Sequence, residues 1–189
     1  MPPEIITSLI AAAPAEVPPI AITQHMGANY LPSFAARLDS LSAATVRLAS
    51  DGLRLTPGLV VVAPGDGHLA VERDALGLRC RIEEGPLVSG HRPSVDVLFR
   101  SVAGAAGSEA VGVILSGMGR DGAAGLSEMR AAGAYTIGEQ ESSCVVYGMP
   151  RVARELGGVC VELPVGRIAA TMLQALDGAA ERVPLPTGE

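Results

Sequence analysis

The chain has 189 residues, the length of one ordinary domain, which buries roughly 70% of the surface that its unfolded chain exposes. Hydrophobic residues make up 48% of the chain but aromatic residues only 3%, so we expect a core of Ala, Val, Leu and Ile. Lys and Arg number 14 against 20 Asp and Glu, and no segment gathers the basic residues into a stripe, which argues against a nucleic-acid partner.

The first third of the chain predicts two helices around a strand. Residues 4–13 form a short apolar helix that ends near Pro14, and the apolar run 20–23 is a buried strand. Residues 30–41 carry apolar side chains at spacings of three and four, which predicts a second helix with one buried face.

Between residues 46 and 83 the pattern changes to short apolar runs. Turn signals such as Asp51-Gly52 and Pro57-Gly58 separate these runs at close spacing. We therefore expect a region of β-hairpins here.

The remaining chain alternates between strands and helices of about a dozen residues, which predicts a mainly parallel sheet covered on both faces. The expected helices cover 94–106, 122–132, 149–157 and 166–177, and the expected strands cover 111–116, 134–138 and 159–163. The fold class is therefore α/β, a doubly wound sheet with an inserted β-hairpin region, in one domain over residues 1–180 with a loose tail at 181–189.

Cysteine usage and the start of the sequence indicate a cytoplasmic protein. Cys80, Cys144 and Cys160 are odd in number and lack metal-ligand spacing, so we expect neither a disulfide framework nor a metal site. No signal peptide precedes residue 20, and no apolar run approaches about 18 residues. We expect no export, no membrane insertion and no cofactor.

In an open α/β sheet, ligands bind beyond the carboxyl ends of the strands. His25 follows the strand 20–23 directly, where an imidazole can serve as a general base. A histidine bonded to a neighbouring backbone carbonyl is the alternative, and position alone favours it.

The second candidate is the turn 117–122, Gly-Met-Gly-Arg-Asp-Gly, between a strand and a helix. Its glycines allow backbone N–H groups to converge on an anion, either a phosphate or the oxyanion of acyl transfer. Asp121 in this turn also suits the N-cap of the following helix, and that structural interpretation stays equally open.

The same turn satisfies G-x-G-x-x-G, and Glu139 lies 22 residues beyond Gly117, where a ribose-binding acid is expected. A dinucleotide-binding protein is therefore an alternative. Against it, Asp121 places negative charge where a pyrophosphate would bind.

Three further groups of residues favour structural roles. His91 to Asp96 form a third polar cluster, in which Ser94 suits the N-cap of the next helix. His68 opens a hairpin strand and is expected at the surface. Met26, Met118 and Met149 either line one pocket or fill packing gaps.

Six blocks in the same order resemble the catalytic domain of CheB-type chemotaxis protein-glutamate methylesterases, over roughly residues 3–175. They are 24–26 (QHM), 51–58 (DG to PG), 62–69 (VAPGDGHL), 91–99 (HRPSVDVLF), 115–123 (LSGMGRDGA) and 141–150 (ESSCVVYGMP). The resemblance implies a doubly wound α/β fold and hydrolysis of γ-glutamyl methyl esters on the cytoplasmic part of chemoreceptors, often with glutamine deamidation.

The family uses a serine, histidine and aspartate triad without a cofactor. Carried over by position, His25 matches the general base, Asp121 the carboxylate that orients it, and the Met118 backbone N–H one oxyanion donor. Gly117, Gly119, Met26 and Met149 are the expected pocket-lining residues.

The family's nucleophile lies in a Gly-Ala-Ser-Thr-Gly-Gly turn after a first strand, and neither matches any segment here. Ser8, Ser33 and Ser116 do not lie on a turn opposite His25. We therefore expect impaired catalysis, with a receptor-docking module that has lost activity as the alternative, and no phospho-control within this chain. Loss of a central strand also predicts reduced stability or self-association.

Overall fold

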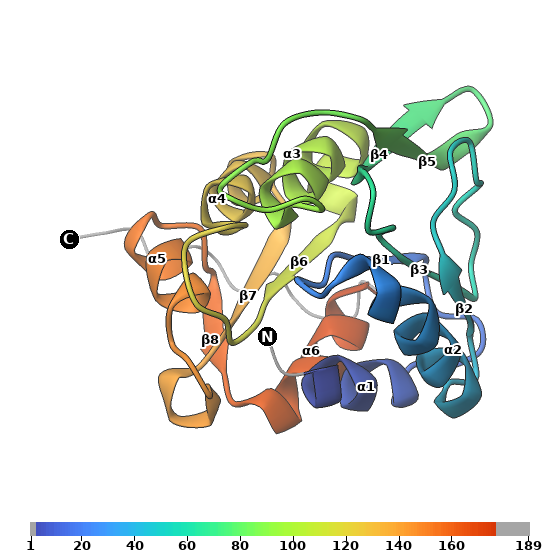
Figure 1. Ribbon diagram of the computed structural model, residues 1–189. Coiled ribbons are helices and arrows are strands. Elements are labelled where there is room, and N and C mark those ends of the chain that lie inside the picture. The colour runs from blue at the N-terminus through green and yellow to red at the C-terminus, as the bar shows by residue number, and fades with distance from the viewer. Residues whose placement is uncertain (1–2, 177–189) are drawn as a thin grey trace.

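The computed structural model describes residues 3–176, and Figure 1 shows a layer of strands between two groups of helices. The helices are α1 (Pro3–Ala11), α2 (Leu31–Leu41), α3 (Val95–Ala106), α4 (Ala123–Ala131), α5 (Met149–Glu155) and α6 (Val165–Leu176). The strands are β1 (Ile20–Ile22), β2 (Thr45–Leu48), β3 (Leu59–Val62), β4 (His68–Asp74), β5 (Gly77–Glu83), β6 (Val111–Ile114), β7 (Tyr135–Glu139) and β8 (Val161–Leu163).

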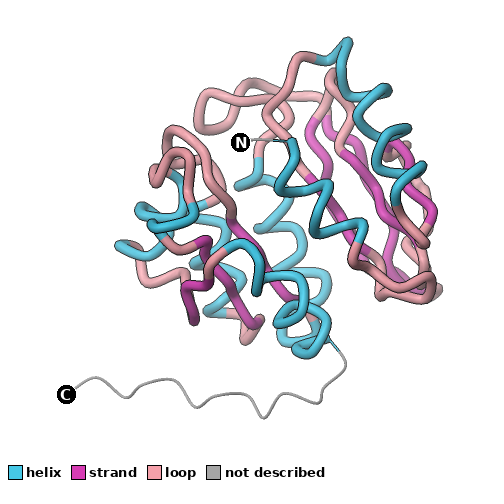
Figure 2. Tube along the Cα trace, turned by 90° about the horizontal axis from the view of Figure 1, so that it is seen from below, coloured by secondary structure: helices cyan, strands magenta, loops and turns pink. Residues whose placement is uncertain are grey.

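The strand layer consists of two separate parallel sheets of three strands and one hairpin. One sheet has the order β1-β3-β2 and the other the order β6-β7-β8, while β4 and β5 pair antiparallel. Figure 2 shows the two groups of strands apart from each other. β1 and β6 are therefore edge strands, each paired only on the side away from the other sheet.

Helices cover both faces of this layer, as the alternation of strands and helices predicts. Along β3, Val60 and Val62 belong to the core cluster that also holds side chains of α1, α2 and α6, whereas Leu59 and Val61 belong to the cluster that holds side chains of α3, α4 and α5. All four side chains are buried, because a parallel strand between two helix layers faces core on both sides.

The prediction of hairpins from residue 46 onward is wrong for its first half. β2 and β3 pair in parallel, with Val46 opposite Val60, and only β4 and β5 form a hairpin. Turn residues such as Asp51-Gly52 reverse the chain between β2 and β3, but the connection is long enough for β3 to enter the sheet in the same direction as β2.

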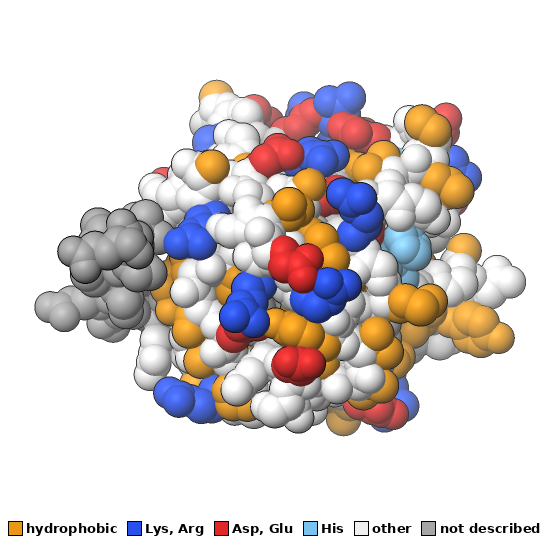
Figure 3. All heavy atoms as spheres, turned by 90° about the vertical axis from the view of Figure 1, so that its left-hand side faces the viewer, with side chains coloured by type: hydrophobic (Ala, Val, Ile, Leu, Met, Phe, Trp, Pro, Cys, Tyr) orange, Lys and Arg blue, Asp and Glu red, His pale blue; other side chains and the backbone are white. Residues whose placement is uncertain are grey.

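The surface seen in Figure 3 carries acidic and basic side chains in alternation. Arg151 and Glu155 form an i, i+4 pair at 2.7 Å, and Arg154 lies 3.3 Å from Glu162. Within the described range, no helix has both the length and the apolar composition needed to cross a membrane. The predicted loose tail, 181–189, lies outside the described residues.

Candidate active site

The predicted general base, His25, and the carboxylate predicted to orient it, Asp121, meet at the carboxyl ends of β1 and β6. His25 lies three residues beyond β1, and Asp121 lies in the turn between β6 and α4. His25 Nε2 is 2.7 Å from Asp121 Oδ2, although 96 positions separate the two residues in the sequence. The parallel arrangement of the strands causes this meeting, because their carboxyl ends share one edge.

Asp121 is only 1% exposed, and its carboxylate accepts three further hydrogen bonds from the start of α3. Ser94 Oγ donates to Oδ1 at 2.6 Å, and the backbone N–H groups of Val95 and Asp96 donate at 2.8 and 3.1 Å. Burial acts to raise the pKa of Asp121, but the hydrogen bonds from His25, Ser94 and the α3 amides outweigh it and hold this pKa below its ordinary value. The carboxylate is therefore ionised and fixed in place.

The expectation that Asp121 caps the helix that follows it, α4, is wrong, because Asp121 caps α3 instead. The N-cap of α4 is Gly122, in the left-handed region at φ 87°, with no side-chain capping bond. Asp121 instead caps α3 across the loop, where the positive end of the helix dipole stabilises its charge. Ser94 is the N-cap residue of α3, as predicted, but its side chain makes no capping bond, because its Oγ donates to Asp121 Oδ1 instead.

The His25 ring is held at its edge by Asp121 and on one face by a second imidazole. His91 stacks on it with ring centroids 3.7 Å apart and planes 8° from parallel. Burial, followed by the neighbouring His25, lowers the pKa of His91, so His91 is a neutral neighbour near pH 7. Because Asp121 binds Nε2, the ring nitrogen Nδ1 is left to accept a proton.

The turn after β6 is clamped to the segment that precedes α5. The Gly117 N–H donates to the Val146 carbonyl at 3.0 Å, and the Gly117 carbonyl accepts from the Met149 N–H at 2.8 Å. A Cβ on Gly117 would collide with Met149 Sδ unless that buried side chain moved, so glycine favours this close approach. The next residue, Met118, has a side chain that is 82% exposed, and its N–H has no backbone partner within residues 3–176.

Glu139 supports the same turn from beneath and is not placed to bind a ribose. Its carboxylate is fully buried and accepts from the Ser116 N–H at 2.7 Å and from Ser143 Oγ at 3.1 Å. The ribose-binding role considered for Glu139 is therefore wrong, because its oxygens are occupied inside the protein.

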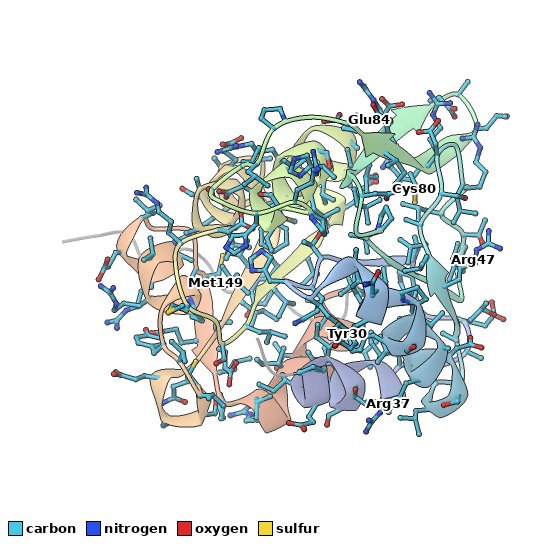
Figure 4. All side chains as sticks on the ribbon, viewed as in Figure 1. Tyr30, Arg37, Arg47, Cys80, Glu84 and Met149 are labelled. Carbon is cyan, nitrogen blue, oxygen red and sulfur yellow. The ribbon has the colours of Figure 1, made fainter. Side chains whose placement is uncertain are left out.

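The other predicted residues are dispersed around this centre. Met26 is partly buried against the core, and Met149 is buried at the start of α5 (Figure 4). Gly119 adopts φ 99°, the left-handed conformation expected of this turn. The surface position expected for His68 is wrong: it is 3% exposed, accepts the Ser94 N–H at Nδ1 and donates from Nε2 to the Pro86 carbonyl.

His91 and Ser94 are the site residues that sequence reasoning assigned to structure alone. The start of α3 is the signal that could have placed Ser94 near Asp121. The first N–H groups of a helix lack partners within the helix, so they attract a buried carboxylate such as that of Asp121.

The candidate replacement hydroxyls do not contact His25. Ser8 Oγ donates to the Glu4 carbonyl, Ser116 Oγ pairs with Val146, and Ser33 is exposed on α2. No described serine in residues 3–176 hydrogen-bonds the His25 ring, and no group of three His, Cys, Asp or Glu side chains in that range is placed to hold a metal ion.

Comparisons with known proteins agree with this geometry. The family model described as CheB methylesterase matches residues 2–172. The chain belongs to the CheB methylesterase family. The crystal structure of the Thermotoga maritima CheB methylesterase catalytic domain superimposes with a TM-score of 0.87 at 34% identity, covering 91% of this chain and 92% of that one. The predicted doubly wound α/β fold and the resemblance to this family are thereby confirmed.

Curated members of the family are similar along most of the chain. It is 57% identical over 171 residues to protein-glutamate methylesterase/protein-glutamine glutaminase 1 of Caulobacter vibrioides, covering 90% of this chain and 49% of the relative. It is 47% identical over 181 residues to protein-glutamate methylesterase/protein-glutamine glutaminase of Escherichia coli (strain K12), covering 95% of this chain and 52% of the relative. The chain thus spans about half the length of the curated relatives it matches.

Proposed function

We propose that this chain supplies the base, its carboxylate partner and one oxyanion donor of a protein-glutamate methylesterase. The substrates are γ-glutamyl methyl esters on the cytoplasmic region of chemoreceptors, with deamidation of receptor glutamines as a related reaction of the same site. The observation that carries the proposal is the 2.7 Å contact between His25 and a buried Asp121 that four donors hold ionised.

The roles follow from the contacts. Asp121 accepts the Nε2–H of His25, which fixes the tautomer with Nδ1 as the basic nitrogen. In the chymotrypsin-type triad the aspartate holds Nδ1 instead, so the two ring nitrogens exchange roles here. When His25 takes up a proton, the fixed charge of Asp121 stabilises the imidazolium.

The reaction needs a hydroxyl oxygen that attacks the ester carbonyl while its proton passes to His25 Nδ1. The carbonyl oxygen becomes an oxyanion, which the Met118 N–H stabilises. When the carbonyl re-forms, the bond to the methoxy group breaks and His25 returns the proton, which releases methanol. Water then cleaves the acyl intermediate by the same steps and leaves the glutamate free.

The attacking hydroxyl in the family is a serine in a Gly-x-Ser-x-Gly-Gly turn, and no described serine takes its place beside His25. We propose that the 189-residue chain alone is impaired for this reason, although oxyanion stabilisation and binding can leave residual activity.

Methanol release from a methylated chemoreceptor tests the proposal. We expect activity from a version that carries the Gly-x-Ser-x-Gly-Gly segment before residue 1, and little from the 189-residue chain. In the longer version, His25→Gln and Asp121→Asn should each lower kcat by about 10³- to 10⁴-fold. Asp66→Asn, at an exposed position, is the matched control.

The proposal would be contradicted if the longer version folds and binds the receptor but releases no methanol. That outcome would favour the second candidate, a receptor-docking module without catalysis. Equal activity in Asp121→Asn and in the unsubstituted longer version would also contradict the roles given to this pair.

A further inference from the structure

His91 belongs to a short arm, residues 85–92, in the segment that connects β5 to α3 (Figure 1). Its ring lies flat on the ring of His25, with centroids 3.7 Å apart and planes 8° from parallel. Among residues 3–176, no hydrogen bond or ion pair involves the ring nitrogens of His91. Within that range, the stack on His25 is therefore the one directional contact of this side chain.

The backbone of the arm is fixed in a conformation that costs energy. Val88 and His91 exchange two backbone hydrogen bonds, of 3.0 and 2.9 Å, which close a turn around Ser89 and Gly90. Both central residues have positive φ, 52° and 82°, as a type I′ turn requires. Within residues 3–176, Ser89 is the only residue other than glycine with positive φ. Strained backbone persists where the surrounding structure enforces it, often at functional sites, so the turn points to a role for the residue that it places.

The Ser89 side chain anchors this turn to the helix layer. Its Oγ donates to Asp96 Oδ2 at 2.8 Å, and Asp96 Oδ1 accepts the Gly125 N–H of α4 at 2.8 Å. Asp96 is only 3% exposed, so this anchor lies inside the contact of α3 with α4. At the ends of the arm, Arg92 Nη1 donates to the Gly85 carbonyl at 2.7 Å. The arm is thus fixed both at its turn and at its ends.

His25 benefits from a flat neighbour, because one hydrogen bond does not fix the plane of an imidazole. The bond from Nε2 to Asp121 sets the position of one ring atom. Rotation of a histidine about its Cβ–Cγ bond is broad, so this bond leaves the direction of Nδ1 loosely defined. A second ring that lies against the face of the first opposes that rotation. Catalytic groups need an orientation held within about 10–20°, which the stack supplies.

We propose that His91 is a positioning residue, whose ring fixes the plane of His25 so that Nδ1 faces the attacking hydroxyl. His91 itself takes no proton from the substrate or the nucleophile. Its neutral ring lies against the imidazolium that forms when His25 takes up a proton. The orientation of His25 is testable without catalysis, whereas the effect of His91 on rate rests on the proposed function.

A substrate-binding role for His91 is the competing interpretation, because its ring nitrogens are free to bind the receptor polypeptide. The geometry favours positioning, since the flat stack and the strained arm both define the plane of the ring. Phenylalanine separates the two roles, because it keeps a flat ring but has no ring nitrogen.

NMR of the 189-residue chain measures the orientation of His25 directly. The ring current of His91 shifts the ring protons of His25 upfield, and the Nε2–H that binds Asp121 gives a low-field signal. In His91→Ala, we expect the ring protons to move downfield and the low-field signal to broaden. His91→Phe should keep the upfield shift and the sharp signal, and Leu76→Ala, at a hairpin position that is 81% exposed, should change neither.

Methanol release by the longer version measures the consequence for rate. His91→Ala should lower kcat by about 10- to 100-fold and leave KM within about twofold, because a misdirected base loses rate and not binding. His91→Phe should stay within about threefold of the unsubstituted longer version in both constants. Urea unfolding of both variants controls for loss of the fold.

Ser89→Ala tests the arm at a distance from the site. Loss of the bond to Asp96 should lower kcat by about 3- to 10-fold and partly reverse the upfield shift of His25. In the His91→Ala background, Ser89→Ala should lower kcat no further, because the arm then carries no ring.

Unchanged His25 signals in His91→Ala would overturn the proposal, and so would a His91→Phe variant as slow as His91→Ala. A raised KM with unchanged kcat in His91→Phe would also overturn it and make His91 a substrate ligand. The proposed function fails separately. If the His25 signals respond as expected but the unsubstituted longer version releases no methanol, the positioning by His91 stands and the catalytic roles are refuted.

Discussion

At the scale of single residues, Asp121 has two roles, helix capping and orientation of an imidazole, which the sequence analysis treated as alternatives. It caps α3 through the Val95 and Asp96 amides and also orients His25. The cap keeps the carboxylate ionised and immobile, which is what an orienting group requires. Stability and the proposed catalytic role therefore depend on one side chain, and a substitution at this position should affect both.

Asp121→Asn should lower the free energy of unfolding at pH 7 by about 2–3 kcal/mol, because charge-assisted hydrogen bonds are lost at a buried position. Urea denaturation measures this effect, and Asp66→Asn, which is exposed, should stay within about 0.5 kcal/mol of the unsubstituted chain.

The pKa of folded Asp121 lies below its unfolded value, so its contribution is full above the unfolded value of about 4 and declines as pH falls through the folded one. The difference between the unsubstituted chain and Asp121→Asn should therefore shrink below about pH 4. A difference that is constant between pH 7 and pH 3 would contradict an ionised carboxylate.

His91 offers a second test at this scale, since the chain has only three histidines to resolve by NMR. Its pKa is lowered first by burial and then by His25. His25→Gln should raise the His91 pKa part of the way to its ordinary value, because burial remains. Asp66→Asn should leave it unchanged, and an unchanged His91 in His25→Gln would mean that the two rings do not interact electrostatically.

At the scale of elements, the sequence predicted the strongly periodic segments well. Helices expected at 30–41 and 94–106 are α2 (31–41) and α3 (95–106), because apolar residues at spacings of three and four mark one buried face. The parallel pairing of β2 with β3 was missed, because short apolar runs between turn residues look alike in a hairpin and in a crossover.

The same limit applies to the site. His25 and Asp121 could be named from their positions after strands and from the family resemblance. The stacking of His91 on His25, and the capping of α3 by Asp121, depend on how separate loops meet in space, which no local pattern records.

The crossing of α3 and α4 gives a prediction for two glycines with opposite outcomes. A Cβ on Gly125 of α4 would lie 2.8 Å from Phe99 Cβ and 2.9 Å from the Asp96 carbonyl oxygen of α3, whereas one on Gly104 of α3 meets nothing within 4 Å. Gly104→Ala should stabilise the chain by about 0.5–1 kcal/mol through helix propensity. Gly125→Ala should destabilise it by about 1–3 kcal/mol because the helices must separate.

Thermal and urea unfolding of the two alanine variants measure this contrast directly. Stabilisation by both would show that α3 and α4 can move apart without cost. Such a result would contradict the close packing of the two helices beneath Asp121.

At the scale of the whole molecule, the two half-sheets share cores above and below the strand layer but not a continuous ladder. One cluster joins β1 and β3 to Leu115 and Ile137 of the other half, and the second joins Val61 to Ile114. The halves therefore hold together by apolar packing between β1 and β6, while the backbone hydrogen bonds of each sheet end at these two strands. Because side-chain packing alone, without backbone hydrogen bonds, joins β1 to β6, we expect these two edges to open more easily than the rest of the strand layer.

Native-state hydrogen exchange should reveal this difference within one molecule. Amides of β3 and β7 lie between two neighbours and should exchange slowly, whereas inner-edge amides of β1 and β6 lack ladder partners and should exchange much faster. The outer edges of the same strands are the internal control, since they pair with β3 and β7. Slow exchange at all four strands, together with a sedimentation coefficient of a dimer, would mean that a second copy pairs with these edges. Slow exchange in a monomer would contradict the separation of β1 from β6, because no other described backbone is placed to protect those amides.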